Sequence, residues 1–244
     1  MSPSTVVAIA TARQRGLMPL TLIVVAVLLL LALRSDPEAG TQVFSGLSGA
    51  WFVVLTLVVG AGLLSEEIES GHAQLVLLRP LTRAQWVAGR FAGAAAIVTA
   101  AGAAAWVLAF AMAVARGEPL LLGARLAVLP LALVQAFAWL SVFCVVGAVT
   151  PGWSNVGLVA VAYVGWKVLK FTVPLALRQP DLAPVLETID HYCGPQDSMG
   201  TAMQIARGER LVVSPALWNL FGMAAAWLGT VELFKRRELA RRRA

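Results

Sequence analysis

The side chains best suited to charge chemistry lie between residues 65 and 93, a segment with the sequence SEEIESGHAQLVLLRPLTRAQWVAGRFAG. Three glutamates precede three arginines, namely Glu66, Glu67, Glu69, Arg79, Arg83 and Arg90. Long apolar runs flank the segment on both sides, and charge this dense is costly to keep near lipid. Ion pairing with a partner at a polar surface is the chemistry these residues suit. A connector that merely anchors its flanking helices explains the composition equally well.

The acidic half of the segment predicts a short helix that leaves an apolar run. Ser65 can accept hydrogen bonds from the amides of a new first turn, where the charges of Glu66 and Glu67 are also favourable. An amphipathic helix is expected from Ser65 to about Leu78, weakened or broken in two at Gly71. The result would be a bent helix rather than one straight, continuous helix.

The basic half predicts a turn followed by a second helix. Arg79 precedes Pro80, and the residue before a proline disfavours the helical conformation. Thr82 and Gln85 then form a Thr-x-x-Gln capping box. The helix that begins there would carry three side chains across the membrane interface into the next apolar run: Arg83, Trp86 and Arg90.

Counting residues excludes several other kinds of chemistry. The lysines are Lys167, Lys170 and Lys235, and none precedes Ser or Thr, so a Walker A phosphate loop cannot form. Two histidines rule out an HExxH protease and a multi-histidine metal centre. The apolar runs hold no paired carboxylates for a proton relay. The sequence therefore predicts no catalytic residues, metal site or cofactor within this chain.

Membrane-spanning helices are the elements predicted to position the charged segment. Hydrophobic residues make up 59% of the 244 residues and charged residues 13%, far from the balance of soluble domains. We expect an all-α polytopic protein in which residues 1–244 form one membrane domain. Six apolar blocks are long enough to cross a bilayer as helices: Leu17–Leu33, Leu47–Leu64, Phe91–Ala115, Leu126–Val149, Val156–Leu177 and about Leu211–Val231.

The distribution of cations predicts that both termini lie in the cytoplasm. More than half of the 19 Lys and Arg residues then fall inside, including Arg13, Arg15 and the tail KRRELARRR. Anchoring at the anionic inner leaflet thus explains the net charge of +6, and nucleic-acid binding is not indicated. The long loop 178–210 would lie outside. Within it, Asp181–Ile189 and Ser198–Arg207 are expected to form short helices at the membrane surface.

Two features of the predicted spans have more than one interpretation. Gly89-x-x-x-Gly93 permits close helix approach, either within the chain or between two copies. Lys167 and Lys170 share one face of the fifth span in the outer half of the bilayer. Snorkelling to the outer headgroups is the simpler interpretation of these lysines. The more specific interpretation is that these lysines line a pathway and bind an anionic headgroup.

The charged segment and the layout of spans together resemble the membrane-spanning subunits of type-2 ABC exporters. In that family a Glu-rich segment is followed by Gly, an apolar stretch, Pro then Arg, and a Gly-basic-x-x-Gly entry to the third span. The matching residues here are Glu66, Glu67, Glu69, Gly71, Leu75–Leu78, Pro80, Arg83 and Gly89–Gly93. His72 and Arg90 stand where the family commonly has Thr and Lys.

The resemblance implies a permease subunit that extrudes an amphipathic, drug-like or lipid-linked substrate across the cell membrane. The loop between its second and third spans would form a coupling helix in a groove of a separate ATPase subunit, which would bind ATP and Mg. A second permease, either another copy or a homologue, would complete the pathway. By similarity, the ATPase-coupling residues would be Glu66, Glu67, Glu69, Gly71, Arg79 and Arg83.

Alternative functions remain beside this resemblance. A structural or assembly membrane protein could recruit partners through the basic tail and the charged segment, whereas a membrane enzyme lacks catalytic residues. A permease that serves maturation of an extracytoplasmic metalloenzyme would explain four soft ligands in the outer loop: His191, Cys193, Met199 and Met203. Their irregular spacing favours an ordinary loop, an outer gate or a docking surface for an extracytoplasmic partner.

Overall fold

A computed structural model describes residues 2–33, 46–70, 81–117, 122–150, 154–179, 181–192, 195 and 213–241. Every regular element in these ranges is an α-helix, as the all-α prediction requires. The helices are α1 (Pro3–Gly16), α2 (Pro19–Leu33), α3 (Gly46–Gly60), α4 (Ser65–Glu69), α6 (Arg83–Ala115), α7 (Leu122–Val149), α8 (Ser154–Ala176), α9 (Leu182–Tyr192) and α11 (Ser214–Arg241).

The N-terminal helix α1 was not predicted from the sequence. Ser2 caps it by accepting a hydrogen bond from the Thr5 amide at 3.3 Å, and Pro3 occupies the first turn, where its missing N–H costs nothing. Pro19 then begins α2, and the two helices meet at a bend of 75°. The segment before the first predicted span is therefore a separate helix.

Four helices in the described ranges are long and apolar enough to cross a membrane: α6, Leu126–Val149 of α7, α8 and Ser214–Phe234 of α11. The bent pair α1 and α2 would supply a fifth span if taken together. Helix α3 has 15 residues. The structure thus describes a polytopic helical membrane protein, while the count of six spans stays a prediction.

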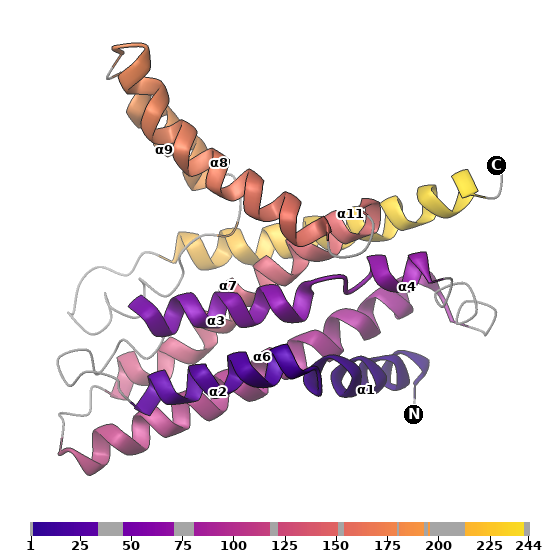
Figure 1. Cartoon of the computed structure of the whole chain (residues 1–244), viewed down its shortest axis with the longest axis horizontal. Coiled ribbons are helices and arrows are strands. Elements are labelled where there is room, and N and C mark those ends of the chain that lie inside the picture. Colours follow the sequence, from indigo (N-terminus) through magenta and orange to yellow (C-terminus); the bar gives the residue numbers. More distant parts are fainter. Residues whose placement is uncertain are drawn as a thin grey trace.

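The bundle is built on α6 and α7, the two long helices at its centre. Helix α1 packs along the first half of α6, and α11 runs along α7. Helix α2 packs against α6 and α3, and α3 packs against both α6 and α7. Alanines line the buried face of α6 and let its neighbours approach closely: Ala94, Ala101, Ala105 and Ala109. Helix α4, the start of α1 and the end of α11 lie at the same end of the bundle (Figure 1).

Helix α8 leaves the bundle at an angle, with α9 beside its far half (Figure 1). Its described side chains are mostly exposed, and its buried residues are Asn155 and Val159 in the first two turns. Helix α9 falls on the predicted short helix Asp181–Ile189 and extends it to Tyr192. The other predicted loop helix, Ser198–Arg207, lies outside the described residues.

Candidate functional site

The charged segment begins at a sharp break between α3 and α4, which we call the elbow (residues 60–65). All six residues of the elbow are buried. Gly62 has φ +62°, a conformation that side chains with a Cβ rarely adopt, and an added Cβ would lie 2.8 Å from the Glu66 carboxylate. The chain therefore needs glycine at this position to turn from α3 into α4. The predicted second span, which ran to Leu64, is interrupted here.

The start of α4 differs from the prediction in its capping. Ser65 is the first residue of the helix, and the N-cap position belongs to Leu64, which makes no side-chain capping hydrogen bond. Ser65 therefore occupies the first helical position and not the N-cap position. Helix α4 ends at Glu69, and Gly71, the predicted breaker, lies outside the described residues.

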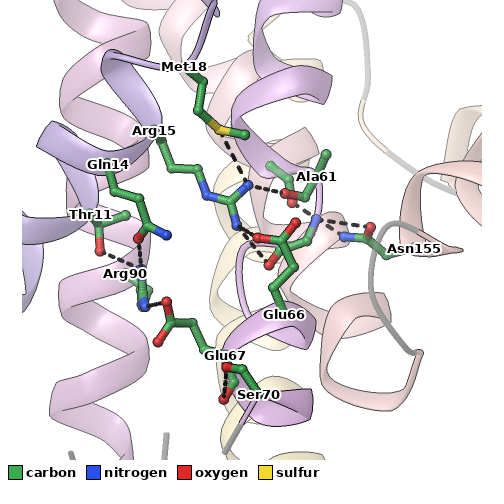
Figure 2. A network of polar contacts seen from close by, with 12 residues as sticks. Thr11, Gln14, Arg15, Met18, Ala61, Glu66, Glu67, Ser70, Arg90 and Asn155 are labelled. Carbon is green, nitrogen blue, oxygen red and sulfur yellow. Dashed lines mark hydrogen bonds and ion pairs between the residues drawn. The ribbon is translucent and has the colours of Figure 1, made fainter. Parts of the chain in front are cut away.

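Arg15 of α1 holds the elbow from one side (Figure 2). Its guanidinium donates to the carbonyls of Ala61 at 2.8 Å and Gly62 at 3.0 Å, and forms an ion pair with Glu66 at 2.6 Å. The Arg15 side chain is 1% exposed and the Glu66 side chain 34%. Carbonyls at the end of a helix favour a cation, so Arg15 suits the end of α3, and it also neutralises the Glu66 carboxylate in the first turn of α4.

Burial lowers the pKa of the Arg15 guanidinium, and the Glu66 carboxylate opposes that shift. Arg15 precedes the first predicted span and remains charged, because an arginine side chain does not lose its proton in proteins. Arg15 therefore contributes a fixed positive charge to the elbow.

Asn155, at the start of α8, holds the elbow from the other side (Figure 2). Its side chain is fully buried, and its Oδ1 accepts a hydrogen bond from the Gly62 amide at 3.2 Å. Its Nδ2 donates to the Gly60 carbonyl at 3.3 Å and to the Phe143 carbonyl of α7 at 3.5 Å. Side chains from two distant helices thus bond to the backbone groups at the break, Arg15 as a donor and Asn155 as both donor and acceptor.

A second ion pair joins Glu67 of α4 to Arg90 of α6. Arg90 is buried and also donates to Thr11 at 3.2 Å and to Gln14 at 3.1 Å, both on α1. We refer to Thr11, Gln14, Arg15, Glu66, Glu67, Arg90 and Asn155 as the elbow cluster. It joins α1, α4, α6 and α8, and its two arginines and two glutamates balance in charge.

The start of α6 is fixed by its own contacts. The predicted capping box is confirmed: the Thr82 hydroxyl accepts from the Gln85 amide at 3.2 Å, and the Gln85 side chain accepts from the Thr82 amide at 2.9 Å. Trp86, one turn further, stacks on Phe234 of α11 with the ring centroids 5.2 Å apart. The Arg90 guanidinium carbon lies 5.8 Å from the Trp86 ring.

Gly89 and Gly93 allow α1 to approach α6 within the same chain. A Cβ added at Gly89 would lie 2.7 Å from the Ser4 carbonyl oxygen. One added at Gly93 would lie 2.5 Å from that of Ala8. Of the two interpretations of this motif, packing within the chain describes the contact seen here.

The remaining predicted site residues lie apart from the elbow cluster. Arg83 is half-buried at the first position of α6, and Glu69 closes α4. On α8, Lys167 is exposed with its amine 5.5 Å from the Tyr163 ring, and Lys170 is half-buried. His191 lies on α9. Predicted residues outside the described ranges are Gly71, Arg79, Cys193, Met199 and Met203.

Sequence reasoning missed the two residues that bind the backbone of the elbow, Arg15 and Asn155. Arg15 was interpreted only as a membrane anchor, and Asn155 fell between the fourth and fifth predicted spans. The Ser2-Pro3 pair is a helix-start signal that could have revealed α1. No local pattern identifies Asn155, because its partners lie 93 and 95 residues away in the chain.

The fold and the elbow cluster define a multi-pass helical membrane protein in which two arginine–glutamate pairs join α1, α4 and α6 at one end of the bundle (Figure 1). Residues 38–231 match the family model described as ABC-2 family transporter protein. That match spans more than half of the chain, so the chain belongs to the ABC-2 family of transporter proteins. It is a permease component of an ABC transporter, and permeases of this family generally work with an ABC ATPase subunit. Comparison with curated proteins finds no match.

Proposed function

We propose that this chain is a six-span exporter permease whose α4 region receives the movement of a separate ATPase subunit. The observation that carries this proposal is the pairing of Glu66 with Arg15 and of Glu67 with Arg90. These pairs fasten a five-residue helix to α1 and α6, so a force applied to α4 acts on the bundle. A connector with acids that are merely solvated would not need buried arginines as partners.

The structure refines the part that each acidic residue plays in this proposal. Glu66 and Glu67 anchor α4 from within, and Glu69, Gly71, Arg79 and Arg83 remain as the residues proposed to contact the ATPase. ATP and Mg would be bound by that subunit. Helix α4 shares one end of the bundle with the start of α1 and the end of α11 (Figure 1). This shared end supports a protein of the cell membrane whose two termini and α4 all lie on the cytoplasmic side.

The exposed length of α8 supports a second element of the proposal. An apolar helix with little burial must meet lipid, substrate or another subunit. We place α8 at the pathway formed with a second permease, where Lys167 and Lys170 would receive the anionic headgroup of an amphipathic or lipid-linked substrate.

Copurification from the native membrane tests the coupling. The expected result is a complex with a subunit that carries a Walker A peptide and hydrolyses ATP in a vanadate-sensitive reaction. Glu69→Lys and Arg79→Glu should weaken this complex, whereas Glu187→Lys, at an exposed site on α9, should not. Reversal of Glu66 or Glu67 is unsuitable, because it breaks ion pairs within the chain. A purified chain that carries no ATPase would instead favour an assembly role.

A further inference from the structure

Helix α8 is attached to the bundle mainly at its first turns. Asn155 and Val159 are its buried residues, and further along the helix Val161 is 74% and Phe171 73% exposed. Tyr163 still contacts Trp139 of α7, with the ring centroids 5.4 Å apart, and Figure 1 shows the far half of α8 diverging from α7 and α11. A helix held at one end turns about that end, so small shifts at Asn155 become larger displacements further along α8.

Asn155 contacts the backbone of the elbow and not its side chains. The Gly62 amide and the Gly60 carbonyl flank Ala61, and Asn155 bonds to both. These two groups change direction together if the turn at Gly62 opens or rotates. The Gly60 carbonyl also accepts a hydrogen bond from the Leu63 amide at 3.2 Å, so the group that depends most on Asn155 is the Gly62 amide. Because this amide is buried, it must keep its hydrogen bond to Asn155, and the first turn of α8 must follow it.

The opposite face of the same turn is bound by Arg15. Arg15 donates to the carbonyls of Ala61 and Gly62 and pairs with Glu66 on α4. The turn is therefore hydrogen-bonded to α1 on one face and to α8 on the other. A displacement of α4 would move the turn through the ion pair between Glu66 and Arg15. Glu67 connects the same helix to α6. Among the described contacts of the elbow, the one through Asn155 leads to α8, whose side chains are mostly exposed beyond its first turns.

We infer that Asn155 is the positioning residue that makes α8 move with the elbow when the ATPase subunit displaces α4. This inference rests on the proposed function. The carboxamide of Asn155 would thus couple the elbow, which lies near the proposed ATPase contact, to α8, which borders the proposed pathway. Asn155 touches neither nucleotide nor substrate, and it acts through the backbone of Gly60 and Gly62.

The test uses the permease with its copurified ATPase in lipid nanodiscs. A bimane fluorophore is attached at Val161→Cys, in a background with Cys193→Ser; the other cysteine, Cys144, is buried. Emission is compared without nucleotide and with Mg-ATP and vanadate. We expect nucleotide trapping to shift the emission maximum, and Asn155→Ala to remove at least half of that shift while ATP hydrolysis continues.

A matched control separates coupling from loss of a buried polar group. Thr56 is also fully buried, but its hydroxyl bonds to Phe52 within α3. Thr56→Val should therefore leave the shift unchanged. Asn155→Asp keeps the size of the side chain and loses the donors to Gly60 and Phe143, so it should also reduce the shift if the alanine variant does not assemble.

The possible outcomes separate the two proposals. If the ATPase copurifies and hydrolyses ATP, but both Asn155 variants retain the full shift, the inference is wrong and the proposed function stands. An equal loss of the shift in Thr56→Val also overturns the inference, because the effect would then be general destabilisation. If the unaltered chain carries no ATPase, the proposed function itself fails.

Discussion

Replacing Arg15 with alanine should destabilise this protein far more than replacing an exposed arginine in a comparable ion pair. Arg15→Ala removes the ion-pair partner of Glu66 and the side-chain donor to the carbonyls of Ala61 and Gly62, of which Gly62 keeps a hydrogen bond from the Glu66 amide. Removing one partner of a buried pair costs about 3–5 kcal/mol. Glu66 is 34% exposed and can take up water, so we expect the lower end, about 3 kcal/mol.

Arg236 on α11 provides the matched comparison. It pairs with Glu232 at 3.0 Å one turn away, but the two side chains are 74% and 51% exposed. An exposed pair of this kind contributes about 0.3–0.5 kcal/mol. The two alanine variants thus change the same residue type in an arginine–glutamate pair and differ chiefly in burial.

Reversible unfolding in mixed micelles, followed by tryptophan fluorescence, measures both variants. The double variant with Glu66→Ala closes a cycle, and residues in direct contact should show a coupling of about 0.5–3 kcal/mol. Arg15→Lys should fall between wild type and alanine, because an ammonium cannot reproduce the planar fork. Equal losses for Arg15→Ala and Arg236→Ala, or additive losses for Arg15 and Glu66, would refute the assignment of Arg15 to the elbow.

Three further changes test other parts of the structure. Gly93→Ala should lower the free energy of unfolding by about 1–3 kcal/mol, because its Cβ would overlap the backbone of α1, whereas Gly165→Ala, with open space around it, should be neutral or stabilising. In the same unfolding measurement, Thr82→Ala should cost about 1 kcal/mol through loss of the α6 cap. Lys167→Gln with Lys170→Gln should abolish stimulation of ATP hydrolysis by phosphatidylglycerol vesicles; unchanged stimulation would remove these lysines from the proposed pathway.

Predictions succeeded where a few neighbouring residues determine the structure. The capping box at Thr82 depends on residues three apart, and long apolar runs are sufficient to locate α6, α7, α8 and α11. The same local reasoning identified the charged segment as the candidate site. It treated the break at Gly62 as part of a continuous span, because an isolated glycine in an apolar run is also compatible with a helix.

The partners of Glu66 and Glu67 could not be predicted for a different reason. Arg15 lies 51 residues before Glu66, and Arg90 reaches back 79 residues to Thr11. Such contacts depend on the packing of α1 against α6, and α1 itself was absent from the prediction. Two acids that were expected to face a partner protein therefore face arginines of their own chain.

The long separations within the elbow cluster also constrain how the protein is made. Ribosomes add about 5–20 residues per second, so Glu66 is made about 3–10 s after Arg15. Arg15 must stay hydrated or paired with lipid phosphate during that time. Asn155 is synthesised later still, 93 residues after Gly62. The elbow therefore gains its last hydrogen bonds only when α8 enters the membrane, which makes assembly of this cluster a late step in biogenesis.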